Sequence, residues 1–342
     1  MAGGIGGNNK VFMQKITYFH RNKQDGFSIL KVSRAFIDEI KKTTDVEEFF
    51  VPHKGSLHPF ATLKNIWFVF KHRNKHGINH VTGDIHFSML ALIGCKSVLT
   101  IHDTYSVEES KNPIKQFIRN QLYYKFCVRL ASQIVCISEK TKNDVQKFIK
   151  KDNIAVIYNA VSPLFRFIPK QFNEQKPVIL QIGTSWNKNL QNTIKALAGV
   201  PCELRIIGKL SDEVICLLEQ ENISFTTKTN LTDEEIVKEY EACDIVSFCS
   251  VFEGFGVPIV EANAVGRCVI TSNIEPMTEI AGNSACLVNP NDVLSIAEGF
   301  KKNISDADYR KKLIDNGQKN IKRFRAENVA KQYLQLYNDL MK

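Results

Sequence analysis

Short apolar runs and amphipathic segments alternate along this chain from residue 15 onward. The runs have the length and β-branched content of buried strands, whereas the segments between them repeat apolar residues with the period of an α-helix. In the first half the strand patterns lie at residues 15–20, 46–52, 78–83, 97–103 and 133–138. In the second half they lie at residues 177–183, 202–208, 223–228, 244–250, 267–273 and 285–290. Strands that alternate with helices predict an α/β fold with parallel sheets.

A stretch without clear periodicity, residues 158–177, separates the two series. Two series joined by such a linker predict two Rossmann-like domains. Ligands in such sheets bind beyond the carboxyl ends of the strands. We therefore expect the binding site in a cleft between the two domains.

Composition narrows the class of protein and its compartment. The chain has 342 residues, of which 44% are hydrophobic and 24% charged, as in ordinary soluble globular proteins. No apolar run approaches the ~20 residues of a membrane span, and the glycine-rich start does not resemble a signal peptide. Residues 1–13 are expected to be an added extension, with Met13 as the natural start. The nine cysteines form no Cys-x-x-Cys pair, which favours reduced thiols in a cytoplasmic protein over disulfides or a zinc site.

The net charge of +9 is unevenly distributed. The first 170 residues carry 26 Lys and Arg against 13 Asp and Glu, whereas the remainder carry 19 against 23. An anionic membrane surface is the favoured partner of the basic half, because no nucleic-acid-binding motif accompanies the charge. Residues 63–77 and 112–130 mix basic and aromatic side chains in helical patterns. We expect these helices to pack on a sheet, and the alternative is that they lie in a membrane interface.

The segment EGFGVPIVEANAVG, residues 253–266, sets two carboxylates eight positions apart around a glycine turn. Gly254 and Gly256 allow a sharp bend and close approach to a bound group. Pro258 suits the first position of a helix, which would place Glu261 in the first turn. The N–H groups and dipole of a helix start attract an anion. Carboxylates beside an anion site favour a ligand with hydroxyls and phosphate, a sugar nucleotide, over the alternative of a solvated surface turn.

This segment resembles the E-x7-E signature of family 4 retaining glycosyltransferases, which have the GT-B fold. The resemblance covers nearly all of the chain after residue 13, and IHDTYS, YNAVSPLF and QIGTSWNKN are similar to segments of bacterial surface-polysaccharide glycosyltransferases. It implies transfer of a hexose-type sugar, with retention of configuration, from a nucleoside-diphosphate sugar to a saccharide or lipid-linked saccharide. UDP is favoured as the commonest nucleotide in the family. No cofactor or metal is implied, and the chain shows no Asp-x-Asp motif suited to one.

The resemblance also assigns roles to the two halves. Residues 14–168 would bind the acceptor, and residues 169–325 would bind the nucleotide sugar. The last segment, residues 326–342, has apolar residues on one helical face and would cross back onto the N-terminal domain. An acceptor on a lipid carrier would place the protein in the cytoplasm, peripherally on the inner face of the cytoplasmic membrane.

On the donor side, the resemblance makes Glu253 the sugar-side carboxylate and Glu261 the ribose carboxylate. Lys188 stands in a Gly-x-x-x-x-Lys pattern and would hold the diphosphate as a compact point charge. Many family members carry an Arg shortly after the glycine of this pattern, where this chain has Thr184 and Ser185. The implied donor-binding set is Gly183, Thr184, Lys188, Asn189, Gly208, Lys209, Glu253, Gly254, Phe255, Gly256, Val257 and Glu261. A tight strand-to-helix turn is the alternative explanation for Gly208 and Lys209.

On the acceptor side, His102 and Asp103 follow a strand at the cleft edge. The resemblance makes His102 a partner of a sugar hydroxyl, with Asp103 orienting its ring or the acceptor; the alternative is a polar strand end. Asp84 and His86 are candidates for acceptor hydroxyls, and a tight turn explains them nearly as well. Gly26 would allow close approach in the first strand-to-helix loop, where the family often has two glycines. The implied catalytic set is Glu253, His102, Lys188 and Asp103.

Two other functions are compatible with the same fold. A nucleotide-sugar epimerase or hydrolase would convert the donor without an acceptor. A non-catalytic binding protein would have a degenerate site, whereas this chain keeps both carboxylates and Lys188.

Overall fold

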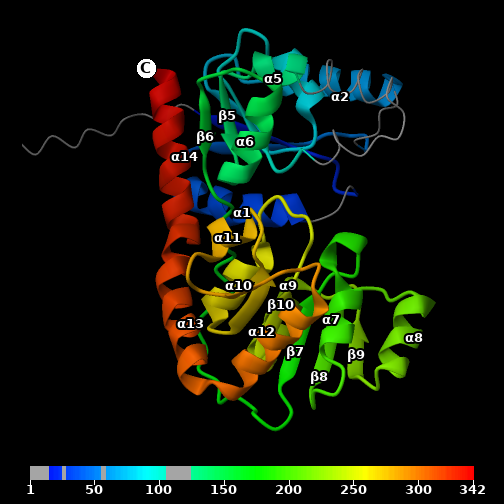
Figure 1. Cartoon of the computed structure of the whole chain (residues 1–342). Coiled ribbons are helices and arrows are strands. Elements are labelled where there is room, and N and C mark those ends of the chain that lie inside the picture. Colours follow the sequence, from blue (N-terminus) through cyan, green and yellow to red (C-terminus); the bar gives the residue numbers. More distant parts are fainter. Residues whose placement is uncertain (1–14, 25–27, 55–58, 105–124) are drawn as a thin grey trace, which may run out of the picture.

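A computed structural model describes residues 15–24, 28–54, 59–104 and 125–342 (Figure 1). The expectations for residues 1–13, for Gly26 and for most of residues 112–130 lie outside these ranges. Within the described residues the strands form two six-stranded sheets, in which the neighbouring strands run parallel. The α/β class with one parallel sheet in each half is therefore confirmed.

The first sheet has the order β2-β1-β3-β4-β5-β6 and the second the order β12-β11-β10-β7-β8-β9. The strands of the first sheet are β1 (Ile16–His20), β2 (Val46–Phe50), β3 (Ile78–Val81), β4 (Ser97–Ile101), β5 (Gln133–Cys136) and β6 (Ile154–Val156). The strands of the second sheet are β7 (Val178–Ile182), β8 (Glu203–Ile207), β9 (Ser224–Lys228), β10 (Ile245–Phe248), β11 (Cys268–Ser272) and β12 (Cys286–Val288). Strand β6 was not predicted from the sequence, although β12, which is equally short, was.

Helices connect the strands in both halves. The helices of the first half are α1 (Ser28–Lys41), α2 (Pro59–His72), the 3-10 helix η1 (His86–Leu92), α5 (Cys127–Leu130) and α6 (Glu139–Phe148). Those of the second half are η3 (Trp186–Lys188), α7 (Leu190–Ala196), α8 (Asp212–Gln220), α9 (Asp233–Ala242), α10 (Val257–Val265), α11 (Met277–Ala281), α12 (Val293–Ser305), α13 (Ala307–Asn320), η4 (Ile321–Phe324) and α14 (Ala326–Met341). None of the described helices is both long and apolar enough to span a membrane.

The last helix joins the two halves. Helix α14 leaves the second half after η4 and runs along the side of the first (Figure 1). Its buried face, which includes Val329 and Tyr333, belongs to the same apolar cluster as residues of α1 and the first sheet. The Tyr337 hydroxyl lies 2.6 Å from His80 Nδ1 and 3.0 Å from the Tyr18 hydroxyl. Since buried hydroxyls need such partners, these bonds specify where α14 docks.

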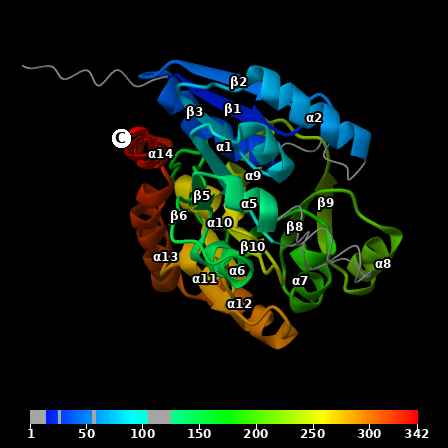
Figure 2. The ribbon, with the colours of Figure 1, turned by 90° about the horizontal axis from the view of Figure 1, so that it is seen from above.

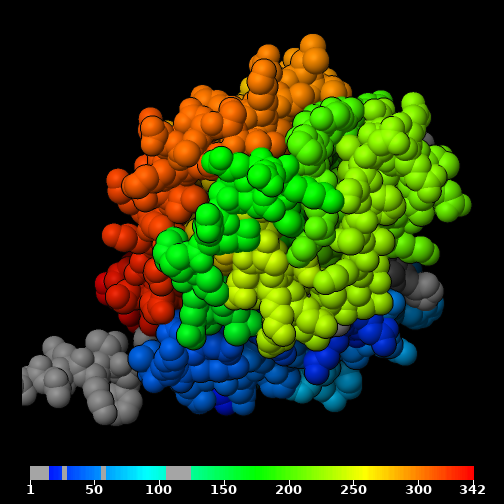
Figure 3. Space-filling view, turned by 90° about the horizontal axis from the view of Figure 1, so that it is seen from below, coloured from blue at the N-terminus to red at the C-terminus, as the bar shows by residue number. Residues whose placement is uncertain are grey.

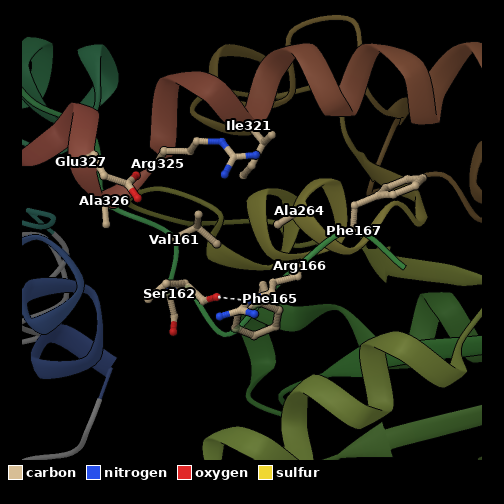
Figure 4. Close-up of a pocket in the computed structure, with 11 residues that line it drawn as sticks. Val161, Ser162, Phe165, Arg166, Phe167, Ala264, Ile321, Arg325, Ala326 and Glu327 are labelled. Atoms are coloured by element: carbon tan, nitrogen blue, oxygen red, sulfur yellow. Dashed lines mark hydrogen bonds between the residues drawn. The ribbon is translucent and has the colours of Figure 1, made fainter. Parts of the chain in front are cut away.

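The linker between the sheets is packed against both halves. The Val161 N–H donates to the Phe324 carbonyl at 2.8 Å, and Phe165 is 5% exposed. Figure 4 shows the linker beside η4 and the start of α14, where a hollow of about 310 Å³ remains. The Arg166 Nε donates to the Pro163 carbonyl at 3.3 Å and so stabilises a turn of the linker.

The two halves also touch at the turn that begins the 253–266 segment. The Ser138 hydroxyl of the first half donates to the Gly254 carbonyl at 2.9 Å. The Glu279 carboxylate of the second half accepts from the Glu139 N–H at 2.8 Å. The view from above shows α14 beside both halves, and the space-filling view from below shows the blue first half in contact with the second half (Figures 2 and 3).

Candidate active site

A cleft of about 450 Å³ lies where the two halves meet. The first half contributes Arg21, Lys31, Asp84, His102 and Asp103 to its wall, and the second half contributes Lys188, Glu253, Gly254, Phe255, Gly256, Val257 and Glu261. The cleft therefore brings together residues that the sequence assigned separately to the donor and acceptor sides.

The turn before α10 is shaped by two glycines. A Cβ at Gly254 would collide with the His102 carbonyl oxygen, so only glycine fits at this contact between the halves. Gly256 is the residue before the helix and has φ +114°, a conformation that favours glycine. At this start Pro258 has no N–H and the Ile259 N–H donates to the Gly256 carbonyl at 3.0 Å, so the Val257 N–H and the helix dipole are what this end of the cleft offers an anion.

The expectation that Glu261 stands in the first turn of this helix is wrong. Helix α10 begins at Val257, one residue before Pro258, so Glu261 is its fifth residue and lies in the second turn. Proline fits this start because it needs no N–H partner there. Glu261 is buried in this turn, with 6% of the residue exposed.

Lys188 and Glu253 form an ion pair in the cleft. The Lys188 Nζ donates to Glu253 Oε1 at 2.5 Å, and the two side chains are 21% and 14% exposed. The ammonium also lies 5.0 Å from the centre of the Phe248 ring. Asn187 Nδ2 supports the carboxylate from the same loop, at 3.3 Å from Glu253 Oε1. The pair places a cation and an anion side by side. The cation can bind an anionic ligand group, and the carboxylate can accept hydrogen bonds from ligand hydroxyls.

Glu261 is held from two directions. The Tyr240 hydroxyl of α9 donates to Glu261 Oε2 at 2.6 Å, and the Lys31 Nζ of α1 lies 3.7 Å from Glu261 Oε1. Burial raises the pKa of Glu261, while the nearby Lys31 ammonium and the Tyr240 hydrogen bond lower it. The carboxylate that the resemblance assigns to ribose is therefore buried, oriented and close to a cation.

The donor-side loops contain several residues with backbone roles. Gly183 has φ +85°, and its absent Cβ leaves room for the Lys188 side chain, whose nearest atom would lie 3.1 Å away. The Thr184 hydroxyl donates to the Lys209 carbonyl at 2.8 Å and packs against Gly208. Asn189 Nδ2 donates to the Cys249 and Pro290 carbonyls, so this amide joins three loops.

The acceptor-side candidates fall into two environments. His102 is 9% exposed, and its Nε2–H donates to the Thr82 carbonyl at 2.8 Å; burial lowers its pKa, which favours the neutral ring. Asp103 is exposed at the cleft wall, where Asp84 accepts from Arg21 at 2.7 Å. His86 is buried in η1, and burial lowers its pKa to about 4. His86 is not among the residues that line the cleft.

Three residues of this region were not predicted from the sequence. Arg21 and Lys31 bring cationic side chains from the first half, and Tyr240 brings a hydroxyl from α9. No local motif marks them, since each acts on a residue far away in the chain. Among the described residues, no group of three or more His, Cys, Asp or Glu side chains is arranged to hold a metal ion.

Two family models match this chain, one in each half. Residues 31–163 match the model described as Glycosyltransferase Family 4. Residues 165–320 match the model described as Glycosyl transferases group 1. The boundary between the two matches falls in the linker beside Val161 and Phe165.

Curated relatives carry glycosyltransferase names. The chain is 22% identical over 318 residues to the N,N'-diacetylbacillosaminyl-diphospho-undecaprenol alpha-1,3-N-acetylgalactosaminyltransferase of Campylobacter jejuni, with 84% of each chain covered. It is 27% identical over 197 residues to the O-antigen chain mannosyltransferase RfbU of Salmonella typhimurium, which covers 53% of this chain and 54% of that protein.

Solved structures share the fold. Sucrose-phosphate synthase from Thermosynechococcus elongatus matches with a TM-score of 0.78 and 16% identity, over 96% of this chain and 99% of that one. Anabaena HepE in complex with UDP-glucose matches with a TM-score of 0.77 and 17% identity, over 95% and 99%. The two facing parallel sheets are thus the GT-B fold. By its two matched halves, this chain belongs to the glycosyltransferases, with a Family 4 N-terminal part and a group 1 C-terminal part.

Proposed function

We propose that this protein is a retaining glycosyltransferase that moves a hexose-type sugar from a nucleoside-diphosphate sugar to a saccharide or lipid-linked saccharide. UDP is the proposed nucleotide, and bacterial surface-polysaccharide synthesis is the proposed setting. The Campylobacter and Salmonella relatives support the setting by their names, and the HepE complexes with UDP and UDP-glucose support the nucleotide. Residues 169–325 bind the donor in this proposal, and residues 14–168 with α14 bind the acceptor.

One observation carries the proposal. Lys188, Glu253 and Glu261 line a single cleft, opposite His102 of the other half. Each suits a different part of a nucleotide sugar. A cation suits the diphosphate, a carboxylate suits sugar hydroxyls, and a second carboxylate suits the ribose hydroxyls.

Charge development in the reaction fits this layout. When the bond from the anomeric carbon to the phosphate oxygen breaks, the diphosphate gains negative charge. Lys188 and the start of α10 stabilise that charge from fixed positions, where preorganised groups are most effective. The leaving phosphate takes the proton of the acceptor hydroxyl as that oxygen bonds to the anomeric carbon on the same face, which retains the configuration. No metal takes part in this scheme.

Glu253 positions the donor sugar in this mechanism. The diphosphate competes with Glu253 for the Lys188 ammonium, and the sugar hydroxyls compete with Lys188 for the carboxylate. The 2.5 Å pair therefore keeps both groups oriented before they contact the donor. The neutral His102 ring uses its Nε2–H for the Thr82 carbonyl. Its Nδ1 is therefore the ring nitrogen that can accept a hydrogen bond, and the residue lies beside the Gly254 turn.

The test is Glu253→Ala. We expect sugar transfer to a lipid-linked saccharide fraction to be lost, while free UDP still binds, because Glu261 and Lys188 remain. Transfer is followed by UDP release with and without acceptor, and binding by calorimetry. Unchanged turnover would remove Glu253 from its role, and donor conversion without acceptor would favour the epimerase or hydrolase.

A membrane surface belongs to the proposed setting, and α2 supports it. Four large apolar side chains of this helix are exposed, namely Phe60 at 72%, Leu63 at 61%, Trp67 at 59% and Phe70 at 51%. Asn65 and Val69 of the same helix are buried, so α2 packs by one face only. The expectation of sheet packing therefore holds for that face alone.

Cations lie beside this exposed face. The Lys71 Nζ is 3.6 Å from the centre of the Trp67 ring, and the Arg73 Cζ is 3.4 Å from that of Phe70. Aromatic and basic side chains together suit the interface of an anionic bilayer. We propose that α2 docks the acceptor half on such a membrane, where each nearby cation contributes about 1 kcal/mol.

Vesicle sedimentation tests this docking. The double variant Trp67→Ser and Phe70→Ser should bind phosphatidylglycerol vesicles at least ~10-fold more weakly, since burial of one such side chain is worth about 1.5–3 kcal/mol. Leu294→Ser, which changes a 74% exposed leucine on α12, is the matched control and should bind as the wild type does. Equal binding of the double variant, or equal wild-type binding to phosphatidylcholine vesicles, would contradict the docking.

A further inference from the structure

Helix α1 carries a side chain from the first half to the second. Lys31 is in its first turn, and its Nζ lies 3.0 Å from Asp233 Oδ1 and 3.7 Å from Glu261 Oε1. Asp233 is the first residue of α9, and Glu261 belongs to α10. Figure 1 shows α1, in blue, between the two sheets and above these helices. One lysine therefore joins two carboxylates across the boundary between the halves.

The surroundings of Lys31 hold it in this place. Its Nζ lies 5.5 Å from the centre of the Phe165 ring in the linker. That ring meets Tyr240 edge-on at 5.3 Å, and Tyr240 donates to Glu261 Oε2. The contacts form one connected set that contains α1, the linker, α9 and α10. Lys31 is 21% exposed, so its ion pairs are only partly screened by solvent.

Glu261 needs such a cation. The Glu261 side chain accepts hydrogen bonds from ribose hydroxyls best when it is ionised, yet desolvation raises its pKa and so favours the protonated form. The groups that face it are the Lys31 ammonium, the Tyr240 hydroxyl and the Asp233 carboxylate. Tyr240 is neutral, because burial raises its pKa, and Asp233 adds a negative charge. Lys31 supplies the opposing positive charge.

The position of Lys31 leaves room for a ligand. Lys31 lines the cleft and also an adjoining hollow of about 590 Å³, whose wall includes Leu231, Thr232 and Ile236. A carboxylate oxygen accepts more than one hydrogen bond, so Glu261 Oε1 can face Lys31 and a hydroxyl together.

We propose that Lys31 is a positioning residue of the donor site, which holds the Glu261 carboxylate ionised and aimed at the ribose from the opposite half. The ribose end of the site is then complete only when α1 lies against α9 and α10. Nucleotide binding is thereby coupled to the contact of α1 with these two helices. This inference rests on the proposed function, because it takes Glu261 as the ribose carboxylate.

Calorimetric titration with UDP and 2′-deoxy-UDP tests the inference. Lys31→Met keeps the aliphatic stem beside Phe165 and removes the charge. We expect it to weaken UDP binding ~10-fold, as the loss of one charged interaction predicts. It should also reduce the preference for ribose over 2′-deoxyribose, because the aim of Glu261 is lost. Lys31→Arg, which keeps the charge, should retain most of the UDP affinity and most of the ribose preference.

The pH profile gives a second readout. Without Lys31 the pKa of Glu261 rises further, so UDP affinity should begin to fall at a higher pH than in the wild type as the pH is lowered. Lys42→Met is the matched control. Lys42 is 65% exposed, pairs with Glu39 and carries the same charge, and its loss should change neither the ribose preference nor the profile.

The outcomes separate this inference from the proposed function. Wild-type protein that binds none of UDP, GDP, ADP and dTDP would overturn both. If the wild type binds UDP and Glu261→Gln weakens it, but Lys31→Met binds as tightly as the wild type or more tightly, only the role of Lys31 falls. The role of Lys31 would also fall if Lys31→Met lost equal affinity for UDP and 2′-deoxy-UDP and kept the wild-type pH profile. That result would indicate an effect on folding alone.

Discussion

Lys188 and Glu253 are the neighbouring cation and anion that we propose contact the diphosphate and the donor sugar. Both lie at the rim of the second sheet, 2.5 Å apart, with Gly183 leaving room for Lys188 and the Asn187 amide 3.3 Å from Glu253 Oε1. The resemblance to family 4 glycosyltransferases implies an arginine shortly after this glycine in many members. Here Thr184 stands in that place and bonds a backbone carbonyl, so Lys188 and the start of α10 carry the leaving-group charge in our account.

Lys188→Met should therefore slow sugar transfer about 100-fold, the scale at which loss of one preorganised group lowers a catalytic rate. UDP binding should weaken as well, because the diphosphate loses its cation. Initial rates of UDP release with acceptor measure the first effect and calorimetry the second. Lys195→Met, on the exposed side of α7, is the control and should leave both unchanged. A Lys188 variant with the wild-type rate would contradict the role.

Single residues differ in how far the sequence predicts them. Lys188, Glu253 and Glu261 stand in local patterns of glycine turns and helix starts, so their place at the cleft could be predicted. Lys31 and Tyr240 could not, because they reach Glu261 only through the packing of α1 and α9 on α10. The roles of the site residues remain predictions for the experiments above.

At the scale of elements, the starts of α6 and α9 depend on local side chains, whereas strand β6 could not be predicted. Nearby side chains cap both helices, since Ser138 accepts from the Thr141 N–H at the start of α6 and Thr232 accepts from the Glu235 N–H at the start of α9. The start of α10 came one residue earlier than expected, because proline is compatible with either of the first two positions. Strand β6 depends on pairing with β5 and leaves too little local signal.

The capping box of α9 offers a stability prediction. Thr232 accepts from the Glu235 N–H at 3.2 Å, and Glu235 accepts from the Thr232 N–H at 2.7 Å. Thr232→Ala should lower the free energy of unfolding by about 1 kcal/mol, while Thr232→Ser should keep it, since serine caps as well. Urea denaturation followed by circular dichroism measures the difference. Equal midpoints for the alanine and serine variants would show that the cap does not stabilise α9.

At the scale of the whole molecule, contacts of α14, the linker and the Gly254 turn hold the two halves together. Helix α14 docks on the first sheet through Tyr337, the linker bonds Val161 to Phe324, and the Gly254 turn meets Ser138 and His102. The serial strand–helix alternation predicts two sheets and a cleft between them. It does not predict which side chains cross the cleft, because those contacts depend on how the halves come together.

The central claim is that the cleft between these halves binds a nucleoside diphosphate through Glu261 and Lys188. Calorimetric titration of the wild-type protein with UDP, GDP, ADP and dTDP tests it most directly, with Glu261→Gln measured beside it. We predict saturable binding, tightest for UDP, that weakens in the Glu261 variant. Absence of binding by all four nucleotides at millimolar concentration, with the protein folded, would contradict the account.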